Sequence, residues 1–275
     1  MPDSRTAASR AAAQGDRPAL AHDGAALPPV AILCGGRGTR LREHARAIPK
    51  PLVEIGGLPI LWHVIGLYAA QGFERFLLAT GYMGAQIERF VADADWPAGI
   101  EVRCLDTGAD TPTGGRIKLL EHVLGDERFC ATYADGLADV DLAALLDYHR
   151  GHGRLATMTV VRPELQFGVT ELDTREGPDG EDGRVLGFQE KPRSEHWING
   201  GFFCFEPGVL ARLAPDSVLE RSPLEGLAAD DQLRAFRHEG FWECMDTYKD
   251  ALALNDLWQS GAPPWGREHI RVGAG

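Results

Sequence analysis

Short apolar runs alternate with segments of helical periodicity in the first half of the chain. Residues 30–34 form an apolar run that ends in glycines, which is typical of a buried parallel strand, and the same pattern recurs at 76–80. Residues 59–72 carry apolar side chains at helical spacing, with a proline at the start and a glycine at the end. The pattern also predicts helices over 86–92 and 117–124 and strands over 100–105 and 129–133. Alternating strands and helices indicate parallel pairing with right-handed crossovers.

The second half is richer in short β-like runs. They cover 156–161, 169–172, 185–190 and 201–205, and the polar segment 176–183 is typical of a hairpin loop between two of them. Helical patterns return at 207–213 and 248–258. Because there is no internal repeat and no long linker, we expect residues 28–265 to form one mixed α/β domain. We expect a Rossmann-like, mostly parallel central sheet with a smaller β-rich part.

The two ends of the chain differ from this domain. Residues 1–27 are rich in alanine, their arginines are offset by aspartates, and they lack the apolar stretch of a secretory signal, so we expect a disordered extension. A transit peptide is the competing interpretation, which the aspartates disfavour. We expect residues 266–275 to form a flexible tail.

Composition and charge exclude several classes of protein. Of the 275 residues, 44% are hydrophobic and 25% are charged, as in an ordinary globular enzyme, and no apolar run approaches the roughly 18 residues of a membrane span. A formal net charge of −12 argues against nucleic acid as a partner, since phosphate contacts need a basic surface. The five cysteines are scattered singly, which favours neither disulfides nor a zinc site and indicates a reducing cytoplasm. None of the nine histidines forms a spaced metal pair, so we expect His63 and His149 to be structural or solvated.

The strongest candidate for chemistry is the glycine-rich segment that follows the first predicted strand. Gly35, Gly36 and Gly38 let backbone N–H groups approach a phosphate closely, because no Cβ obstructs them. Five basic residues and one acid lie between positions 37 and 50 of an otherwise acidic chain, and Lys50 stands between two prolines that restrict its backbone. The spacing matches neither a P-loop nor a dinucleotide fingerprint. We favour a triphosphate cradle over a plain glycine turn with a solvated basic face.

These residues resemble the sugar-nucleotide pyrophosphorylases, nucleotidyltransferases that join a nucleoside triphosphate to a sugar 1-phosphate. The resemblance rests on the pair of motifs GGRGTRL at 35–41 and PKP at 49–51, and it extends over 30–265. Within the family the chain is most similar to the glucose-1-phosphate cytidylyltransferases, through stretches such as FQEKP at 188–192 and MDT at 245–247. The resemblance implies their α/β fold, with a smaller β-rich part that binds the sugar.

The resemblance also implies roles for individual residues. The nucleotide and its phosphates would contact Leu33, Cys34, Gly35, Gly36, Arg37, Gly38, Thr39, Arg40, Lys50, Gly81, Thr111, Thr113, Arg116 and Ala134. Arg40, Lys50 and Asp135 would act in catalysis, and Asp135 and Asp246 would hold Mg²⁺. The sugar phosphate would contact Gly168, Glu190, Lys191 and Asn199. The expected assembly is a homo-oligomer.

Three features depart from the cytidylyltransferase pattern. Ala134 stands where those enzymes have glycine before the metal aspartate, and Cys34 replaces an alanine. The stretch between Ala92 and Asp106 is shorter, because it lacks an insertion associated in those enzymes with nucleotide binding and subunit contacts. These departures bear on the choice of nucleobase and on the oligomeric state.

Several site residues have a structural alternative. Asp135 precedes a glycine and could form a turn, and Asp246 precedes a predicted helix and could be its N-cap. Glu190 and Lys191 could be an exposed ion pair, and Asn199 could belong to a turn.

The resemblance implies that an oxygen of the sugar phosphate attacks the α-phosphorus of the nucleotide in line while pyrophosphate leaves. Because two anions must meet, positioning and charge neutralisation dominate, and no protein nucleophile is needed. CTP with α-D-glucose 1-phosphate is the specific expectation, and dTTP, GTP or another phosphorylated acceptor is the first alternative. A nucleotide-sensing or scaffold relative without turnover is the second, which the joint presence of Arg40, Lys50, Asp135 and Asp246 disfavours.

Overall fold

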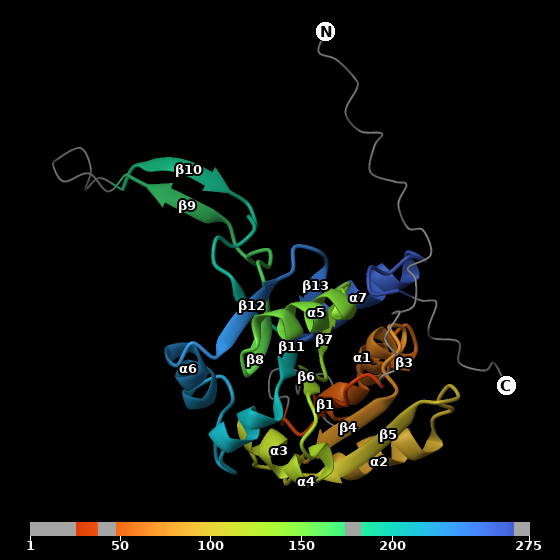
Figure 1. Cartoon of the computed structure of the whole chain (residues 1–275). Helices are drawn as coiled ribbons and strands as arrows, with labels where there is room; N and C mark the ends of the chain where they lie inside the picture. Colours follow the sequence, from red (N-terminus) through yellow and green to blue (C-terminus); the bar gives the residue numbers. More distant parts are fainter. Residues whose placement is uncertain (1–25, 38–47, 174–182, 267–275) are drawn as a thin grey trace.

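The computed structural model describes residues 26–37, 48–173 and 183–266, and its centre is a seven-stranded sheet (Figure 1). The strands are β1 (Val30–Leu33), β4 (Arg75–Thr80), β5 (Glu101–Asp106), β6 (Phe129–Tyr133), β8 (Ala156–Val161), β11 (Ile198–Phe205) and β12 (Leu233–Arg237). They lie in the order β12–β8–β11–β6–β1–β4–β5. All neighbours are parallel except β11, which runs antiparallel to both of its neighbours. The expected mostly parallel α/β sheet is confirmed.

Helices cover both faces of the sheet, because successive residues of a strand point to opposite sides. Val30 and Ile32 of β1 belong to one core cluster, and Ala31 belongs to the other. The first cluster is completed by α1 (Ile60–Ala69), α2 (Gly84–Asp93), α5 (Leu142–His152) and α7 (Tyr248–Gln259). The second is completed by α3 (Thr113–Leu119), α4 (Glu121–Leu124), the 3₁₀ helix η3 (Pro207–Arg212) and α6 (Ser222–Ala229).

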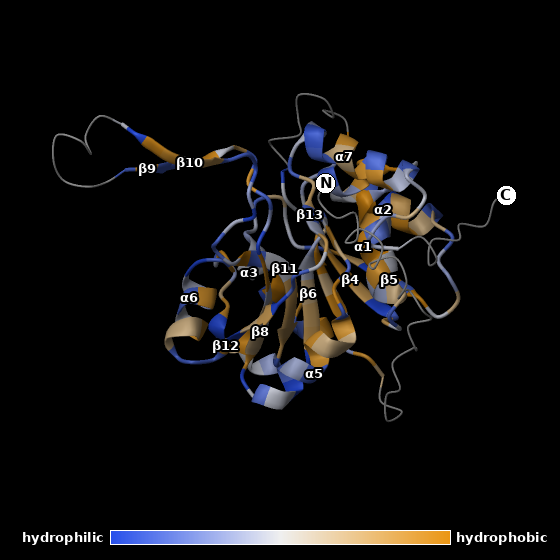
Figure 2. Cartoon of the chain, turned by 90° about the horizontal axis from the view of Figure 1, so that it is seen from above, coloured by the Kyte–Doolittle hydropathy of each residue, from blue (hydrophilic) through white to orange (hydrophobic). Residues whose placement is uncertain are grey.

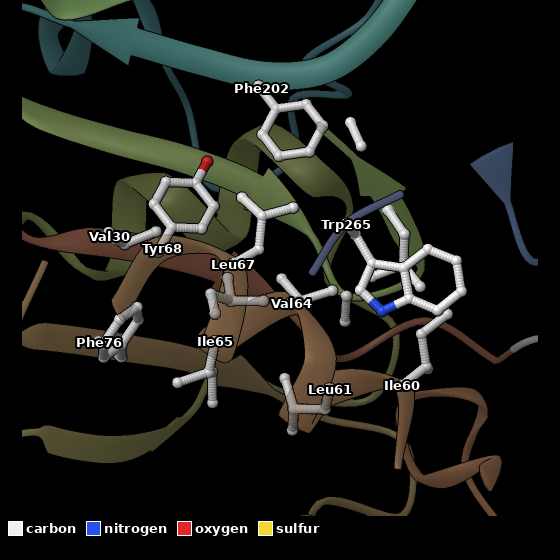
Figure 3. Packing of buried hydrophobic residues seen from close by; sticks show 14 of the residues in the cluster. Val30, Ile60, Leu61, Val64, Ile65, Leu67, Tyr68, Phe76, Phe202 and Trp265 are labelled. Atoms are coloured by element: carbon white, nitrogen blue, oxygen red, sulfur yellow. The ribbon is translucent and has the colours of Figure 1, made fainter. Parts of the chain in front are cut away.

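The helix α1 lies at the centre of the larger core cluster (Figure 3). Eight of its ten residues are buried, so its sequence is apolar nearly all round rather than along one stripe. The ring of Tyr68 stacks on Phe202 of β11, with 6.0 Å between ring centroids. This packing fixes α1 against the middle of the sheet.

Several elements differ in extent or type from the sequence expectation. The helix expected over 117–124 begins at Thr113 and is divided into α3 and α4, and the segment 207–213 is a 3₁₀ helix. The pattern does not predict α5, although Leu142, Leu145 and Leu146 form its buried stripe and Asp141 caps it by accepting a bond from Ala144 N–H at 2.9 Å. It also does not predict α6 or the edge strand β12, which are short and only partly buried.

The four β-like runs of the second half belong to two different sheets. Two of them are β8 and β11, which join the central sheet. The other two, β9 (Val169–Leu172) and β10 (Val185–Gln189), form a separate antiparallel hairpin that projects from the body (Figure 2). Of the expected hairpin loop 176–183, only residue 183 is described.

The expected terminal segments fall almost entirely outside the described residues, which include only 26 and 27 of the extension and 266 of the tail. Within the described part of the chain, no helix combines the length and apolar character needed to cross a membrane.

His63 and His149, two histidines expected to be structural or solvated, are both buried. Nε2 of His63 lies 2.8 Å from the carbonyl oxygen of Ile55, and Nδ1 accepts a hydrogen bond from the indole N–H of Trp265 at 3.3 Å. The neutral ring with its proton on Nε2 satisfies both contacts. Burial lowers the pKa of His63 to about 4.

We expect the free energy of unfolding to decrease as the pH falls from 7 to 4. An unfolded His63 takes up a proton near pH 6.5, whereas the folded ring does so only near pH 4, so acid favours the unfolded chain by about 3 kcal/mol at pH 4. Urea unfolding at several pH values measures this change. His63→Gln should show a shallower pH dependence than the unchanged chain, and equal slopes would contradict the assignment.

Candidate active site

A short two-stranded ladder brings Asp135 and Asp246 to the same place. Asp135 follows β6 and precedes β7 (Gly136–Ala138), and Asp246 follows β13 (Trp242–Cys244). The strands β7 and β13 are antiparallel, with Gly136 opposite Cys244. The backbone N–H of Met245 donates to the carbonyl oxygen of Asp135 at 2.9 Å, which extends this pairing. Both carboxylates therefore lie at the carboxyl end of β6, where open α/β sheets bind ligands.

The ammonium group of Lys50 lies between these two carboxylates. Its Nζ is 2.5 Å from Oδ2 of Asp135 and 2.7 Å from Oδ1 of Asp246. Lys50 begins the 3₁₀ helix η2 (Lys50–Leu52), with Pro49 as its N-cap residue. Burial alone would lower the pKa of Lys50, but the charge of Asp135 and the hydrogen bonds to both carboxylates outweigh it and raise the pKa. The lysine is therefore held charged and in a defined position.

Asp135, Asp246 and Cys244 form a group that fits a divalent cation. One potential ligand atom from each lies within 4.8 Å of the others. Burial raises the pKa of the Cys244 thiol, which keeps it protonated and leaves the two carboxylates as the charged oxygen donors. One or two carboxylates together with substrate phosphates are the usual environment of Mg²⁺. The residues present therefore suit a hard divalent ion.

A pocket of about 410 Å³ opens beside this group, within the usual size range of small-molecule sites. Eight of the expected functional residues line it, namely Leu33, Gly35, Gly36, Arg37, Thr111, Thr113, Arg116 and Asp135. Segments that follow β1, β5 and β6 thus meet around one cavity, although they are far apart in the sequence.

The buried guanidinium of Arg116 connects three segments beside the pocket, those at the ends of β1, β4 and β5. It donates to the carbonyl oxygens of Gly35 and Thr80 at 2.9 Å each and to the hydroxyl of Thr107 at 2.5 Å. Only 3% of the residue is exposed, and burial lowers the pKa of Arg116. Arg116 therefore supports the shape of the pocket through the backbone around it.

Arg116 also explains two of the expected glycines. A Cβ atom on Gly35 would lie 1.9 Å from Nη1 of Arg116, and one on Gly81 would lie 2.6 Å from the same atom. The Cβ of Gly81 would also lie 2.5 Å from the carbonyl oxygen of Gly108. Both positions need glycine because the buried guanidinium and the neighbouring backbone leave no room for a side chain.

Arg37 of the pocket lining and the expected nucleotide residues outside that lining have different surroundings. Cys34 and Ala134 are buried in the core, so their side chains are not exposed to a ligand. Arg37 is exposed and forms an ion pair with Asp110, with 2.5 Å between Nη2 and Oδ1. Gly38, Thr39 and Arg40 lie outside the described residues.

The expected sugar-phosphate residues do not line the pocket, as far as its described lining goes. Gly168, Glu190 and Lys191 lie at the base of the β9–β10 hairpin, where the ring of Phe188 covers Gly168. Asn199 belongs to β11 and donates to the hydroxyl oxygen of Tyr133 at 3.2 Å.

Tyr133 and Glu220 link the two sides of the site, and sequence reasoning missed both. The Tyr133 hydroxyl donates to Glu220, and so does the hydroxyl of Thr113, at 2.6 Å. With the bond from Asn199, a continuous chain of hydrogen bonds joins Asn199 of the expected sugar-phosphate set to Thr113 of the expected nucleotide set. The place of Tyr133 at the end of a buried strand is a signal that could have identified it, whereas no motif marks Glu220.

The structure corrects one alternative for Asp246. The helix α7 is capped by Thr247, whose side chain accepts from Asp250 N–H in a capping box. Asp246 is therefore not the N-cap, and its carboxylate binds Lys50 instead.

The chain is similar in sequence and in fold to known proteins. The chain is 40% identical over 255 residues to a probable glucose-1-phosphate cytidylyltransferase of Bacillus subtilis (strain 168), which covers 85% of this chain and 97% of that protein. It is 40% identical over 261 residues to the glucose-1-phosphate cytidylyltransferase of Salmonella typhimurium, with the same coverage. The solved structure of HddC from Yersinia pseudotuberculosis has the same fold, with a TM-score of 0.64 at 22% identity over 84% of this chain and 100% of that one. The family model for nucleotidyl transferases matches residues 30–243, and the chain belongs to that family.

Proposed function

We propose that the protein joins CTP to α-D-glucose 1-phosphate and releases CDP-glucose and pyrophosphate. The observation that carries this proposal is the cluster of Lys50, Asp135 and Asp246 beside a pocket lined by the glycine-rich segment. The choice of CTP and glucose 1-phosphate rests on the two bacterial relatives at 40% identity, whose names state that activity.

In this reaction an oxygen of the sugar phosphate forms a bond to the α-phosphorus of CTP, and the bond from that phosphorus to the β-phosphate oxygen breaks. Pyrophosphate leaves with the electron pair of the broken bond. The backbone N–H groups at Gly35 and Gly36 and the charge of Arg37 would bind the triphosphate. Lys50 would neutralise the negative charge that develops around the α-phosphorus, and its fixed position avoids reorganisation in the transition state.

We propose Mg²⁺ as the cation held by Asp135 and Asp246, with Cys244 beside them. When bound, the ion would offset the charge of the phosphates and help to align them. A cytoplasmic location remains our expectation, because the five cysteines are scattered singly along the sequence. A CDP-sugar would serve the synthesis of a polysaccharide or a glycosylated metabolite.

Pyrophosphate release with four nucleoside triphosphates and several sugar 1-phosphates tests the proposed substrates. We expect the highest kcat/KM with CTP and α-D-glucose 1-phosphate, and no release without a divalent cation. A higher value with dTTP, GTP or another acceptor would keep the reaction and change the substrates. Nucleotide binding without pyrophosphate release from any pair would indicate a binding protein and overturn the proposal.

A further inference from the structure

A carboxylate outside the pocket holds two of the residues that line it. Glu220 precedes α6, is exposed and does not belong to the described pocket lining. Its Oε2 accepts a hydrogen bond from the hydroxyl of Thr113 at 2.6 Å, and its Oε1 accepts one from the hydroxyl of Tyr133. Thr113 begins α3 and Tyr133 ends β6, so a single side chain joins two walls of the pocket.

The chemistry of Glu220 fixes the direction of each hydrogen bond around it. A carboxylate only accepts hydrogen bonds, and a hydroxyl has a single proton to donate. With its proton directed at Glu220, the oxygen of Tyr133 can only accept from Asn199, whose Nδ2 lies 3.2 Å away. The backbone N–H of Gly201 donates to Oδ1 of Asn199 at 2.9 Å. Two independent contacts therefore set the same orientation of the Asn199 amide.

The two hydroxyls have little freedom to rearrange. The ring of Tyr133 packs edge-on against Phe203, with 6.0 Å between ring centroids, and Gly201 lies against the same ring. A Cβ atom on Gly201 would lie 2.7 Å from Cδ2 of Tyr133, and this glycine has a φ of +80°. The oxygen of Thr113 accepts from the backbone N–H of Leu219 at 2.9 Å. Packing and backbone contacts thus hold both hydroxyls in place.

Thr113 is left with one way to bind a ligand. Its oxygen has two lone pairs, and the N–H of Leu219 occupies one of them. Because its proton is directed at Glu220, Thr113 offers the pocket a lone pair and no donor. It therefore suits a hydrogen-bond donor of the nucleotide, either the cytosine amino group or a ribose hydroxyl. It does not suit a phosphate oxygen, which only accepts.

Asn199 keeps one donor and one acceptor. Its amide carries two N–H donors and two lone pairs, and the contacts with Tyr133 and Gly201 use one of each. The remaining N–H and lone pair have a fixed order in space, which suits a sugar hydroxyl because a hydroxyl both donates and accepts. Without Glu220, the proton of Tyr133 would be free to turn toward Asn199 and would favour the flipped amide.

We propose that Glu220 is a positioning residue that sets the hydrogen-bonding polarity of Thr113 toward the nucleotide and of Asn199 toward the sugar. This inference rests on the proposed function, from which it takes the two substrates. Glu220 contacts neither substrate and acts through the hydroxyls of Thr113 and Tyr133. Because it lies outside the charge cluster at the carboxyl end of β6, its loss should weaken substrate binding more than the chemical step.

Steady-state kinetics of three nearly isosteric variants test the two branches separately. Glu220→Gln should raise the KM for CTP and the KM for glucose 1-phosphate at least about fivefold, with kcat within about threefold of the unchanged protein. Tyr133→Phe should raise only the KM for glucose 1-phosphate, and Thr113→Val only the KM for CTP.

Glu225→Gln is the matched control for these variants. Glu225 is an exposed glutamate of α6 outside the described pocket lining, so both KM values should stay unchanged. Unchanged KM values in Glu220→Gln, or a loss confined to kcat, would overturn the proposal. Equal rises of both KM values in all three variants would indicate a general loss of structure and would overturn it as well.

The nucleotide group that Thr113 binds is identified by comparing substrates for Thr113→Val. If Thr113 accepts from the cytosine amino group, the preference for CTP over UTP should fall at least about fivefold. If it accepts from a ribose hydroxyl, the preference for CTP over 2′-deoxy- or 3′-deoxy-CTP should fall instead. If all of these ratios were unchanged, Thr113 would accept nothing from the nucleotide, and the nucleotide branch of the proposal would be wrong.

A stability measurement separates a failure of this inference from a failure of the proposed function. In urea unfolding without substrates, Glu220→Gln and Tyr133→Phe should be coupled, so the double variant should shift the midpoint by less than the sum of the single shifts. Absence of turnover with this coupling intact would overturn the proposed function and the substrate roles of Thr113 and Asn199. Additive shifts with normal turnover would overturn only the role of Glu220.

Discussion

Replacing Lys50 with methionine is expected to lower kcat for pyrophosphate release by about 10²- to 10³-fold. Methionine keeps the apolar stem and removes the ammonium that lies 2.5 Å from Asp135 and 2.7 Å from Asp246. The charge on the phosphates then develops without a fixed cation from the protein, while the glycine-rich segment is unchanged. The measurement is kcat and KM under saturating CTP, with circular dichroism to confirm the fold.

Lys118→Met is the matched control for this variant. Lys118 forms an ion pair with Glu121 at 2.8 Å on the outer surface of α3 and α4 and donates to Leu210 O at 3.1 Å. Its loss should change kcat by less than twofold, because that pair is partly exposed and lies away from the pocket lining. If both methionine variants kept full activity, the ammonium of Lys50 would have no part in the reaction.

Replacing Arg116 with leucine is expected to lower the free energy of unfolding by about 4 kcal/mol, since several buried oxygens lose their donor at once. The carbonyl oxygens of Gly35 and Thr80 and the hydroxyl of Thr107 would be left without the guanidinium. These groups shape the pocket in which we propose that CTP binds, so the KM for CTP should rise by at least tenfold. Urea unfolding and steady-state kinetics measure the two effects.

Two comparisons separate this effect from a general loss of charge. Arg212→Leu removes an exposed pair with Asp230 at 2.7 Å and should change the unfolding free energy by under ~1 kcal/mol. Arg116→Lys keeps the charge but not the planar fork, so it should restore only part of the loss. If Arg116→Leu left the free energy of unfolding and the KM unchanged, the segments around Gly35, Thr80 and Thr107 would hold their shape without this side chain.

The parts of the site that sequence reasoning predicts best are those encoded locally. The glycines at 35 and 36 and Lys50 between its prolines occur in short motifs, and the structure places them around one cavity and one charge cluster. The proximity of Asp135 and Asp246 is different, because it depends on the pairing of β7 with β13. Each of these strands has only three residues, which is too short for any periodicity to be detected.

The fold shows the same contrast. Buried strands such as β1 and β4 have continuous apolar runs and are predicted within one residue. The sequence cannot say that β8 and β11 belong to the central sheet while β9 and β10 leave it, because all four are short β-like runs. The strands that join a sheet are decided by pairing between residues far apart in the sequence. The burial of Arg116 could not be predicted either, since a basic residue gives no local sign that it will be buried.

The charge cluster joins positions from opposite ends of the chain, with Lys50 and Asp246 separated by 196 residues. During synthesis on the ribosome, β1, β4 and β6 emerge long before β13, so the glycine-lined cavity precedes its second carboxylate. A fragment that stops before Trp242 would retain most of the cavity wall and lack the ladder that positions Asp246. Such a fragment would therefore lack the second carboxylate of the proposed cation site, and it would also lose α7 and the part of the first core cluster that α7 supplies.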